Sequence, residues 1–208
     1  MDARVFDIDG TLLESFEADC DLFIMAVRKV LGVVEVSRDW STYPHVTDQG
    51  VLREIFRVNG IRPEPELFEA TEREFIALLK AHIDTKGPFR EIPGAKDFVF
   101  SLISSERHYV AYATGAWRES ALLKLKSAGF PVDGIHIATS SEHEDRVSIM
   151  RAALAGVSGT PEKITYYGDG VWDRAAAQEL GWNFVPVGPM LQGINDFDGI
   201  TCDVFFGG

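Results

Sequence analysis

The sequence predicts an α/β fold, in which a parallel sheet is covered by helices on both faces and a helical segment follows the first strand. Short β-prone segments alternate with segments whose apolar residues recur three and four positions apart. This alternation is typical of consecutive βαβ units. It is absent between about residues 14 and 92, where several helical patterns follow one another without a strand.

Five β-prone segments are the expected strands, because each is short and rich in β-branched or aromatic residues. They lie at residues 4–6, 108–113, 134–137, 164–167 and 183–187. Between them, apolar residues such as Phe98 and Leu102 recur at helical spacing, as they do in 122–125 and 149–154. In a sheet of this kind, ligands usually bind at the carboxyl ends of the strands.

The segment that breaks the alternation is predicted to be helical. Its helices are expected at residues 20–31, 50–58 and 65–82, with turns marked by glycine and proline. The chain is expected to rejoin the sheet near Pro93-Gly94. We therefore predict two domains, a core made of residues 1–13 and 93–208 and a helical insert made of residues 14–92.

Composition and charge exclude several classes of protein. The chain has 32 acidic and 20 basic residues and a net charge of -12, so most of its surface would repel nucleic acid and anionic membranes. No apolar run reaches the roughly 18 residues of a membrane span, and the amino terminus leaves no room for a signal peptide. Cys20 and Cys202 have neither zinc-site nor disulfide-framework spacing. These features favour a cytoplasmic protein without nucleic-acid or membrane partners.

Two carboxylates directly follow the first predicted strand, in the run Asp7-Ile8-Asp9-Gly10-Thr11-Leu12. One carboxylate can act as a covalent nucleophile toward phosphorus. A second one nearby can protonate the leaving oxygen and later deprotonate water. Taken alone, the same residues would equally suit a solvated turn in which they satisfy backbone groups.

Two further segments offer groups that bind phosphate. Thr114 and Gly115 follow the strand at 108–113, where a hydroxyl can donate to a phosphoryl oxygen. Arg146 opens a predicted helix and could offset charge between a nucleophile and a phosphate. Each has an ordinary alternative, a helix-entry turn for Thr114 and a surface ion pair for Arg146.

The fourth segment contains Asp169 and Asp173, just beyond the strand at 164–167. Carboxylate oxygens at this position suit Mg²⁺, although Asp173 would also serve as a cap of the next helix. All four segments end a predicted strand or open the helix after one. We therefore expect them to converge on one crevice.

Together these motifs resemble those of the haloacid dehalogenase superfamily over nearly the whole chain. The first motif matches residues 7–12 and the second matches Thr114. Arg146 stands where the family places a lysine or arginine, and residues 168–173 match the fourth motif. The insert is similar to the cap of the phosphoglycolate-phosphatase-like branch. The resemblance implies a Rossmann-like, doubly wound core with this cap closing over it.

The resemblance also implies an activity, that of a Mg²⁺-dependent phosphatase acting on a small phosphorylated metabolite through an aspartyl-phosphate intermediate. Asp7 would be the nucleophile and Asp9 the general acid and base. Thr114 would donate to the phosphate and Arg146 would be the charge clamp.

The implied Mg²⁺ ligands are Asp7, Asp169 and the carbonyl of Asp9, with Asp173 supporting the metal or orienting the arginine. Lys163 competes with Arg146 for the basic position. Lys163 directly precedes the strand at 164–167, which is the wrong end, so we prefer Arg146.

Substrate selection is expected to lie with the cap. Thr47 and Asp48 form a pair that looks like one found in similar caps, and with Gly115 they are the candidate substrate contacts. Equally, Thr47 or Asp48 would simply cap the helix at 50–58.

Three other functions remain open at this point. One is a phosphomutase of the same superfamily, which returns the phosphoryl group to a sugar. The others are a phosphoaspartate signalling module and a binding protein without turnover. Asp9 argues against a dehalogenase, because members with that activity lack the second acid. The sequence determines neither the phosphate ester nor whether the chain is a monomer or a dimer.

Overall fold

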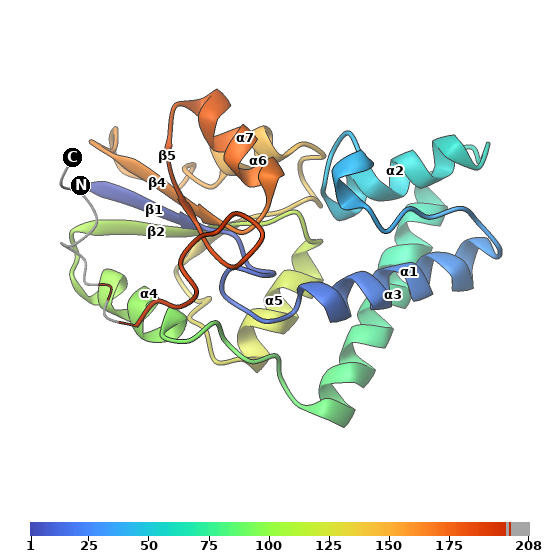
Figure 1. The fold of residues 1–208 in the computed structure, drawn as a ribbon, viewed down its shortest axis with the longest axis horizontal. Coiled ribbons are helices and arrows are strands. Elements are labelled where there is room, and N and C mark those ends of the chain that lie inside the picture. Colours follow the sequence, from blue (N-terminus) through green and yellow to red (C-terminus); the bar gives the residue numbers. More distant parts are fainter. Residues whose placement is uncertain (199, 201–208) are drawn as a thin grey trace.

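A five-stranded parallel sheet runs through one half of the protein in the computed structural model, which describes residues 1–198 and 200 (Figure 1). The strands are β1 (Asp2–Phe6), β2 (His108–Ala113), β3 (His136–Ala138), β4 (Ile164–Gly168) and β5 (Asn183–Pro186). All five fall on predicted strand segments, and β3 begins two residues later than the sequence pattern predicted. The predicted α/β fold class is confirmed.

The strand order is β3-β2-β1-β4-β5, and every pair of neighbours is parallel. The chain adds strands on one side of β1 and then returns to the other side, so the order reverses between β1 and β4. Phe6 at the end of β1 is paired with both Tyr112 and Tyr167. The three central strands therefore end at the same level, and the residues that follow them emerge side by side at the reversal, where ligands bind in such sheets.

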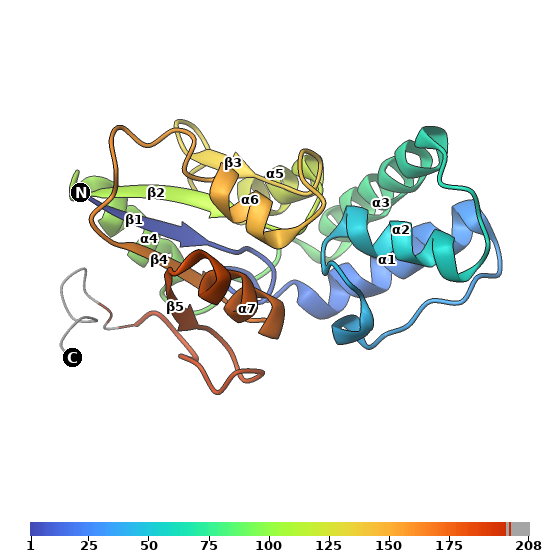
Figure 2. The ribbon, with the colours of Figure 1, turned by 90° about the horizontal axis from the view of Figure 1, so that it is seen from above.

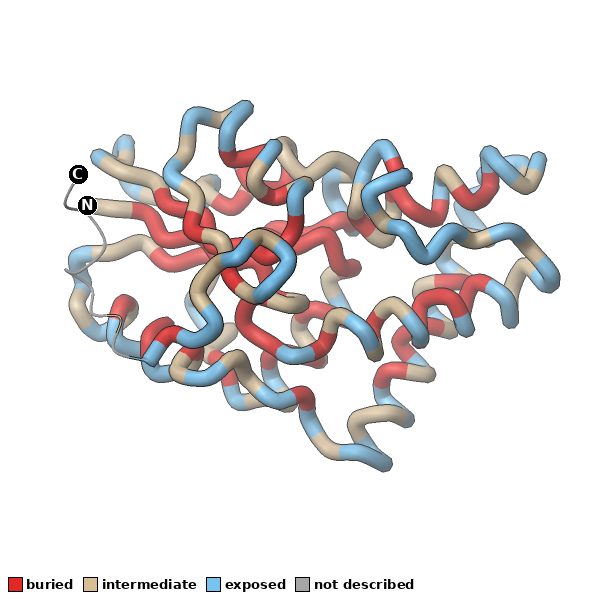
Figure 3. Tube along the Cα trace, in the orientation of Figure 1, coloured by how far each residue is buried: buried red, intermediate tan, exposed pale blue. Residues whose placement is uncertain are grey.

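Four helices cover the two faces of the sheet. They are α4 (Ala95–Ser104), α5 (Arg118–Ser127), α6 (Arg146–Ala152) and α7 (Val171–Leu180). In Figure 1, α6 and α7 lie above the sheet, and α4 and α5 lie below it. Side chains alternate between the faces because the strand period is two residues. Val5 accordingly packs with the α6 and α7 cluster, and Phe6 packs with α4. Figure 3 shows the strands largely buried.

Between β1 and α4 the chain forms three helices and a short 3₁₀ turn. They are α1 (Phe16–Leu31), the turn Trp40–Thr42, α2 (Asp48–Val58) and α3 (Pro65–Lys86). Figures 1 and 2 place this insert beyond the carboxyl ends of β1 and β2. The helix starting at Phe16 begins four residues earlier than the sequence pattern predicted, because the polar first turn hides the apolar spacing. Among the described residues, no helix combines the length and the apolar character needed to cross a membrane.

The insert is connected to the sheet by two chain segments that lie side by side. Glu14 N donates to the Arg90 carbonyl at 2.8 Å, and Ile92 N donates to the Leu12 carbonyl at 2.9 Å. Leu13 and Glu91 form an antiparallel bridge between these two bonds. The division into a core and an insert at residues 14 and 92 stays a prediction. Positions 199 and 201–208 of the predicted core, including Cys202, lie outside the described residues.

Candidate active site

Three buried carboxylates form the centre of the site. Asp7 follows β1, Asp169 follows β4 and Asp173 lies in the first turn of α7. One carboxylate oxygen from each residue lies within 4.8 Å of the other two. The strand order explains this proximity, since β1 and β4 are neighbours at the point where the order reverses.

The local backbone holds two of these carboxylates in place. Asp173 accepts a hydrogen bond from Gly170 N at 3.0 Å, which satisfies an otherwise unpaired donor at the start of α7. Gly10 has a φ of +79°, and a Cβ atom there would lie 2.2 Å from an Asp169 carboxylate oxygen. Only glycine can therefore form this turn against Asp169.

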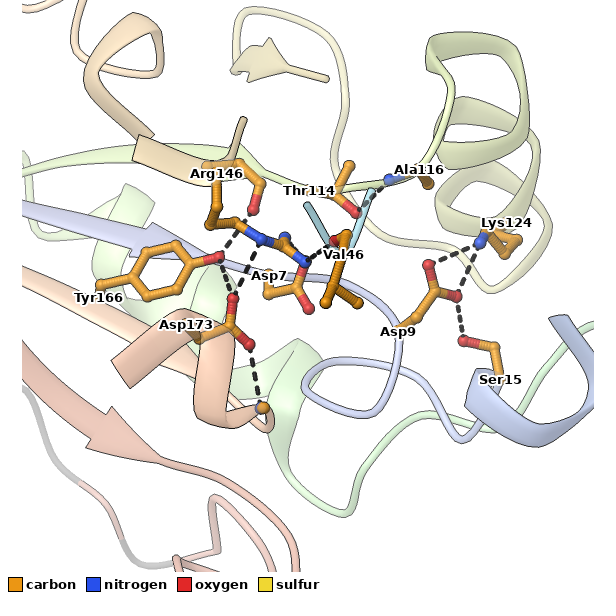
Figure 4. A network of polar contacts seen from close by, with 12 residues as sticks. Asp7, Asp9, Ser15, Val46, Thr114, Ala116, Lys124, Arg146, Tyr166 and Asp173 are labelled. Carbon is orange, nitrogen blue, oxygen red and sulfur yellow. Dashed lines mark hydrogen bonds and ion pairs between the residues drawn. The ribbon is translucent and has the colours of Figure 1, made fainter. Parts of the chain in front are cut away.

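The Arg146 guanidinium bridges the carboxylates (Figure 4). Nη1 donates to Asp7 Oδ1 at 3.2 Å, Nη2 donates to the Val46 carbonyl at 3.1 Å, and Nε forms an ion pair with Asp173 Oδ1 at 3.4 Å. Lys163 directly precedes β4 and so lies at the amino end of this strand, whereas the site lies at the carboxyl ends. The basic group in the site is therefore Arg146.

The carboxyl groups of the site have raised pKa values. Burial raises the pKa of Asp7 to about 7 against the opposing effect of Arg146, and Asp173 adds to the rise. Burial, with repulsion from Asp173 and Asp7, raises the pKa of Asp169 to about 9. The pKa of Asp173 is also raised, mainly by burial. Asp7 and Asp169 therefore bind protons near neutral pH in the absence of a cation.

This arrangement fits a divalent cation. When all three carboxyl groups are ionised, they and the one guanidinium leave an excess of two negative charges, which a divalent ion would offset. Hard oxygen ligands in a partly open site are those that Mg²⁺ prefers, because it keeps positions for water and phosphate oxygens. Asp7 and Asp169, from adjacent strands, can supply such ligands.

Thr114 and Gly115 follow β2 and line the same cavity. The Thr114 hydroxyl accepts a hydrogen bond from Ala116 N at 3.2 Å, which leaves its own hydrogen available to donate into the cavity. A Cβ atom on Gly115 would lie 2.8 Å from the Val46 carbonyl and 2.9 Å from Arg146 Nη2. The absence of a side chain at Gly115 thus allows the insert to approach the sheet.

Thr47 and Asp48 join the insert to the loops of the core. The Thr47 hydroxyl accepts from a backbone N–H in the first turn of α2 at 3.0 Å and donates to the Glu144 carbonyl at 2.6 Å. Asp48 N donates to the Gly115 carbonyl at 2.8 Å, and the Asp48 carboxylate accepts from Trp117 N at 2.8 Å. The helix-capping alternative therefore holds for Thr47, and both residues also line the cavity.

Asp9 has a set of partners that the sequence did not reveal. Lys124 Nζ donates to both Asp9 carboxylate oxygens, at 2.7 and 2.6 Å, and to Asp19 Oδ1 at 2.6 Å. The Ser15 hydroxyl donates to Asp9 Oδ1. Figure 4 shows Asp9 turned toward Lys124 and Ser15. Burial alone would lower the pKa of Lys124, but Asp19 and Asp9 hold this pKa well above its usual value.

One signal in the sequence could have found Lys124. It lies three residues after Ala121 and next to Leu125, so it belongs to the face of α5 that is buried. A lysine on such a face is rarely fully buried unless it is paired. The helical spacing thus indicates that Lys124 lies on the buried face of this helix.

The cavity in front of these groups has a volume of about 80 Å³. Its walls away from Asp7 are mainly aromatic and apolar, from residues Phe16, Phe23, Trp40, Val46, Val51 and Trp172. Asp9, Asp19 and Asp48 add carboxyl groups. Among the described residues that line the cavity, Arg146 alone has a basic side chain.

Comparison with known proteins gives a family match and a shared fold. A family model described as haloacid dehalogenase-like hydrolase matches residues 1–181. Among curated proteins, none matches the chain.

Several solved structures share the fold. CbbY from Rhodobacter sphaeroides, in complex with phosphate, has a TM-score of 0.70 and 21% identity, over 97% of this chain and 90% of that one. The β-phosphoglucomutase from Clostridium difficile has a TM-score of 0.68 and 15% identity, over 90% and 84%. A candidate phosphoglycolate phosphatase from Lactobacillus plantarum has a TM-score of 0.61 and 19% identity, over 88% and 84%.

Proposed function

Because the chain belongs to the haloacid dehalogenase-like hydrolase family, we propose that it is a Mg²⁺-dependent phosphatase of a small phosphorylated metabolite. The observation that carries this proposal is the buried group of Asp7, Asp169 and Asp173 bridged by Arg146. A carboxylate nucleophile held beside a guanidinium and a cation site is suited to phosphoryl transfer, in which charge stabilisation supplies most of the catalysis.

Asp7 is the proposed nucleophile. One of its carboxylate oxygens attacks phosphorus, the bond from phosphorus to the ester oxygen breaks, and Asp9 gives its proton to that oxygen. A water molecule then attacks the aspartyl phosphate, and Asp9 takes the proton of this water. The bond between phosphorus and Asp7 breaks, which releases phosphate and restores the carboxylate.

The other groups of the site stabilise the charge that develops on the phosphoryl oxygens. Thr114 would donate through its hydroxyl hydrogen, since the hydroxyl oxygen is the atom that accepts from Ala116 N, and Arg146 would reach the phosphoryl group from beside Asp7. Bound by Asp7, Asp169 and the carbonyl of Asp9, Mg²⁺ would offset the repulsion between the carboxylate and the phosphate.

We assign residues 14–92 the role of a cap. Thr47 and Asp48 already contact the loops that carry Gly115 and Arg146, and the two-segment connection at 12–14 and 90–92 offers a place for bending. A cap excludes water from the first step and admits it for the second. Substrate selection then lies with the cap residues that face the cavity.

The charge of the cavity narrows the substrate class. A second phosphate or a carboxylate on the substrate would need a basic partner, and Arg146 is already engaged by Asp7. A leaving group without a second anionic group fits the apolar and acidic wall. The same argument favours a phosphatase over a phosphomutase, because a mutase returns the phosphoryl group to a sugar phosphate and must bind both phosphates.

A screen of phosphate monoesters with Mg²⁺, with released phosphate as the readout, tests the proposed function. We expect kcat/KM for uncharged or amino alcohol phosphates to exceed that for phosphoglycolate and for sugar bisphosphates by at least about tenfold, equivalent to about 1.4 kcal/mol. Hexose 1-phosphate is included as a mutase substrate. Its isomerisation without phosphate release would contradict the phosphatase assignment, and no hydrolysis of any ester would contradict the enzymatic one.

A further inference from the structure

A fully buried ammonium group, that of Lys124, contacts the Asp9 carboxylate. The Lys124 side chain is 0% exposed, whereas the Asp9 side chain is 14% exposed and lines the cavity. Lys124 itself does not line the cavity. Its three N–H groups have three acceptors, the two oxygens of Asp9 and one of Asp19, at 2.6 to 2.7 Å. The ammonium is therefore saturated and supports Asp9 from the protein interior.

Stability alone does not explain this lysine. The desolvation of a buried ion pair costs about as much as its attraction returns, so replacing all members of such a group with apolar side chains of similar size is often neutral. An apolar residue would also continue the face that Ala121 and Leu125 form on α5. Packing therefore gives no reason for a charge here, and the carboxylate that the ammonium holds by both oxygens is the proposed acid and base.

We propose that Lys124 is a positioning residue for Asp9. Together with the Ser15 hydroxyl, its ammonium fixes the Asp9 carboxylate from two elements, α5 and the turn before α1. Proton transfer requires this carboxyl group within hydrogen-bonding distance of the leaving oxygen, and a displacement of about 1 Å can cost about 100-fold in rate. Asp19 on α1 shares the ammonium, which links the first helix of the insert to Asp9. This inference rests on the proposed phosphatase activity.

The Lys124→Met variant tests the proposal, because methionine keeps the length of the side chain and removes the charge. The readout is kcat/KM, which covers the steps up to departure of the leaving group, measured with two esters. An alkyl phosphate needs protonation of its leaving oxygen, and nitrophenyl phosphate does not. We expect a fall of about 10-fold to 100-fold with the alkyl ester and of no more than about threefold with the nitrophenyl ester.

A double variant separates positioning from charge balance. Lys124→Met leaves the buried Asp19 without its cation, and adding Asp19→Asn removes that unpaired charge. The melting temperature of the double variant should recover toward that of the parent, while the difference between the two esters persists. Lys126→Met, on the exposed face of the same helix, is the matched control and should leave kcat/KM for both esters unchanged.

Three results would overturn the inference. Equal loss with both esters would mean a structural role. Recovery of alkyl ester hydrolysis in the double variant would mean that Lys124 only neutralises Asp19. Unchanged kinetics in Lys124→Met would mean no role at all. A parent protein that hydrolyses neither ester would overturn the proposed function as well, so the two failures are distinguishable.

Discussion

Replacement of Asp7 with asparagine is expected to lower phosphate release by about 10⁴-fold or more, because the amide oxygen cannot form the aspartyl phosphate. The substitution keeps the shape of the side chain at a position that is almost fully buried. Burial and the neighbouring Asp173 raise the pKa of Asp7, so loss of its charge also relieves repulsion within the site. Metal-free Asp7→Asn protein should therefore fold normally. Released phosphate, with a screen for radiolabelled phosphoenzyme after rapid quenching, measures the effect.

Asp2→Asn is the matched control for this experiment. Asp2 is the first residue of β1, and Asp7 directly follows the last. The control therefore changes an acid at the other end of the same strand, away from the site. We expect parental activity and parental phosphoenzyme for the control. Turnover by Asp7→Asn at the rate of the parent, or label retained in that variant, would assign the nucleophile to another residue.

Removal of Mg²⁺ with a chelator is the second change with a large expected effect, a complete loss of activity that added Mg²⁺ reverses. Without a cation, Asp7 and Asp169 bind protons near neutral pH, which removes part of the nucleophilic carboxylate, and no positive ion offsets the charge of the phosphate. Asp169→Asn should weaken Mg²⁺ binding by about 100-fold or more, since it removes a direct ligand. Asp133→Asn, an exposed acid, is the control. Full chelator resistance of the parent would contradict a metal-dependent reaction.

Thermal unfolding reports on the same cation site without catalysis. A concentration of 100 times the dissociation constant stabilises a protein by about 2.7 kcal/mol, which corresponds to a rise of about 5–10 °C in melting temperature for a chain of this size. The rise should be lost in Asp169→Asn and kept in Asp133→Asn. An equal rise in both variants would place the cation elsewhere.

The effect of pH on the metal-free protein follows from the raised pKa values of Asp7 and Asp169. These groups bind protons in the folded state up to about pH 7 and 9, whereas in the unfolded chain they lose them near pH 4. The folded protein thus binds more protons over this range, so its free energy of unfolding should fall as pH rises. Mg²⁺ competes with these protons, and its affinity and stabilising effect should rise over the same range. A melting temperature shift by Mg²⁺ that is independent of pH would contradict this coupling.

The sequence by itself determined the order of βαβ units and the residues at the carboxyl ends of the strands. Strand length, helical spacing and turn residues are local signals. In a parallel sheet they also determine which segments follow the carboxyl ends of the strands. Asp7, Thr114 and Asp169 could therefore be assigned to one crevice without a structure. The resemblance of residues 7–12 to the first motif of the family assigned Asp9 to the same crevice.

Only the tertiary structure decided what surrounds those residues. Lys124 pairs with both Asp9 and Asp19 and so joins segments that are far apart in the chain. Helical spacing places this lysine on the buried face of α5, but it does not identify the partners of the ammonium group. The wall of the cavity, with Arg146 as its basic group, likewise depends on how α1 and α2 pack over the sheet. Local sequence patterns specify elements, but the direction and charge environment of each side chain are set by packing between elements.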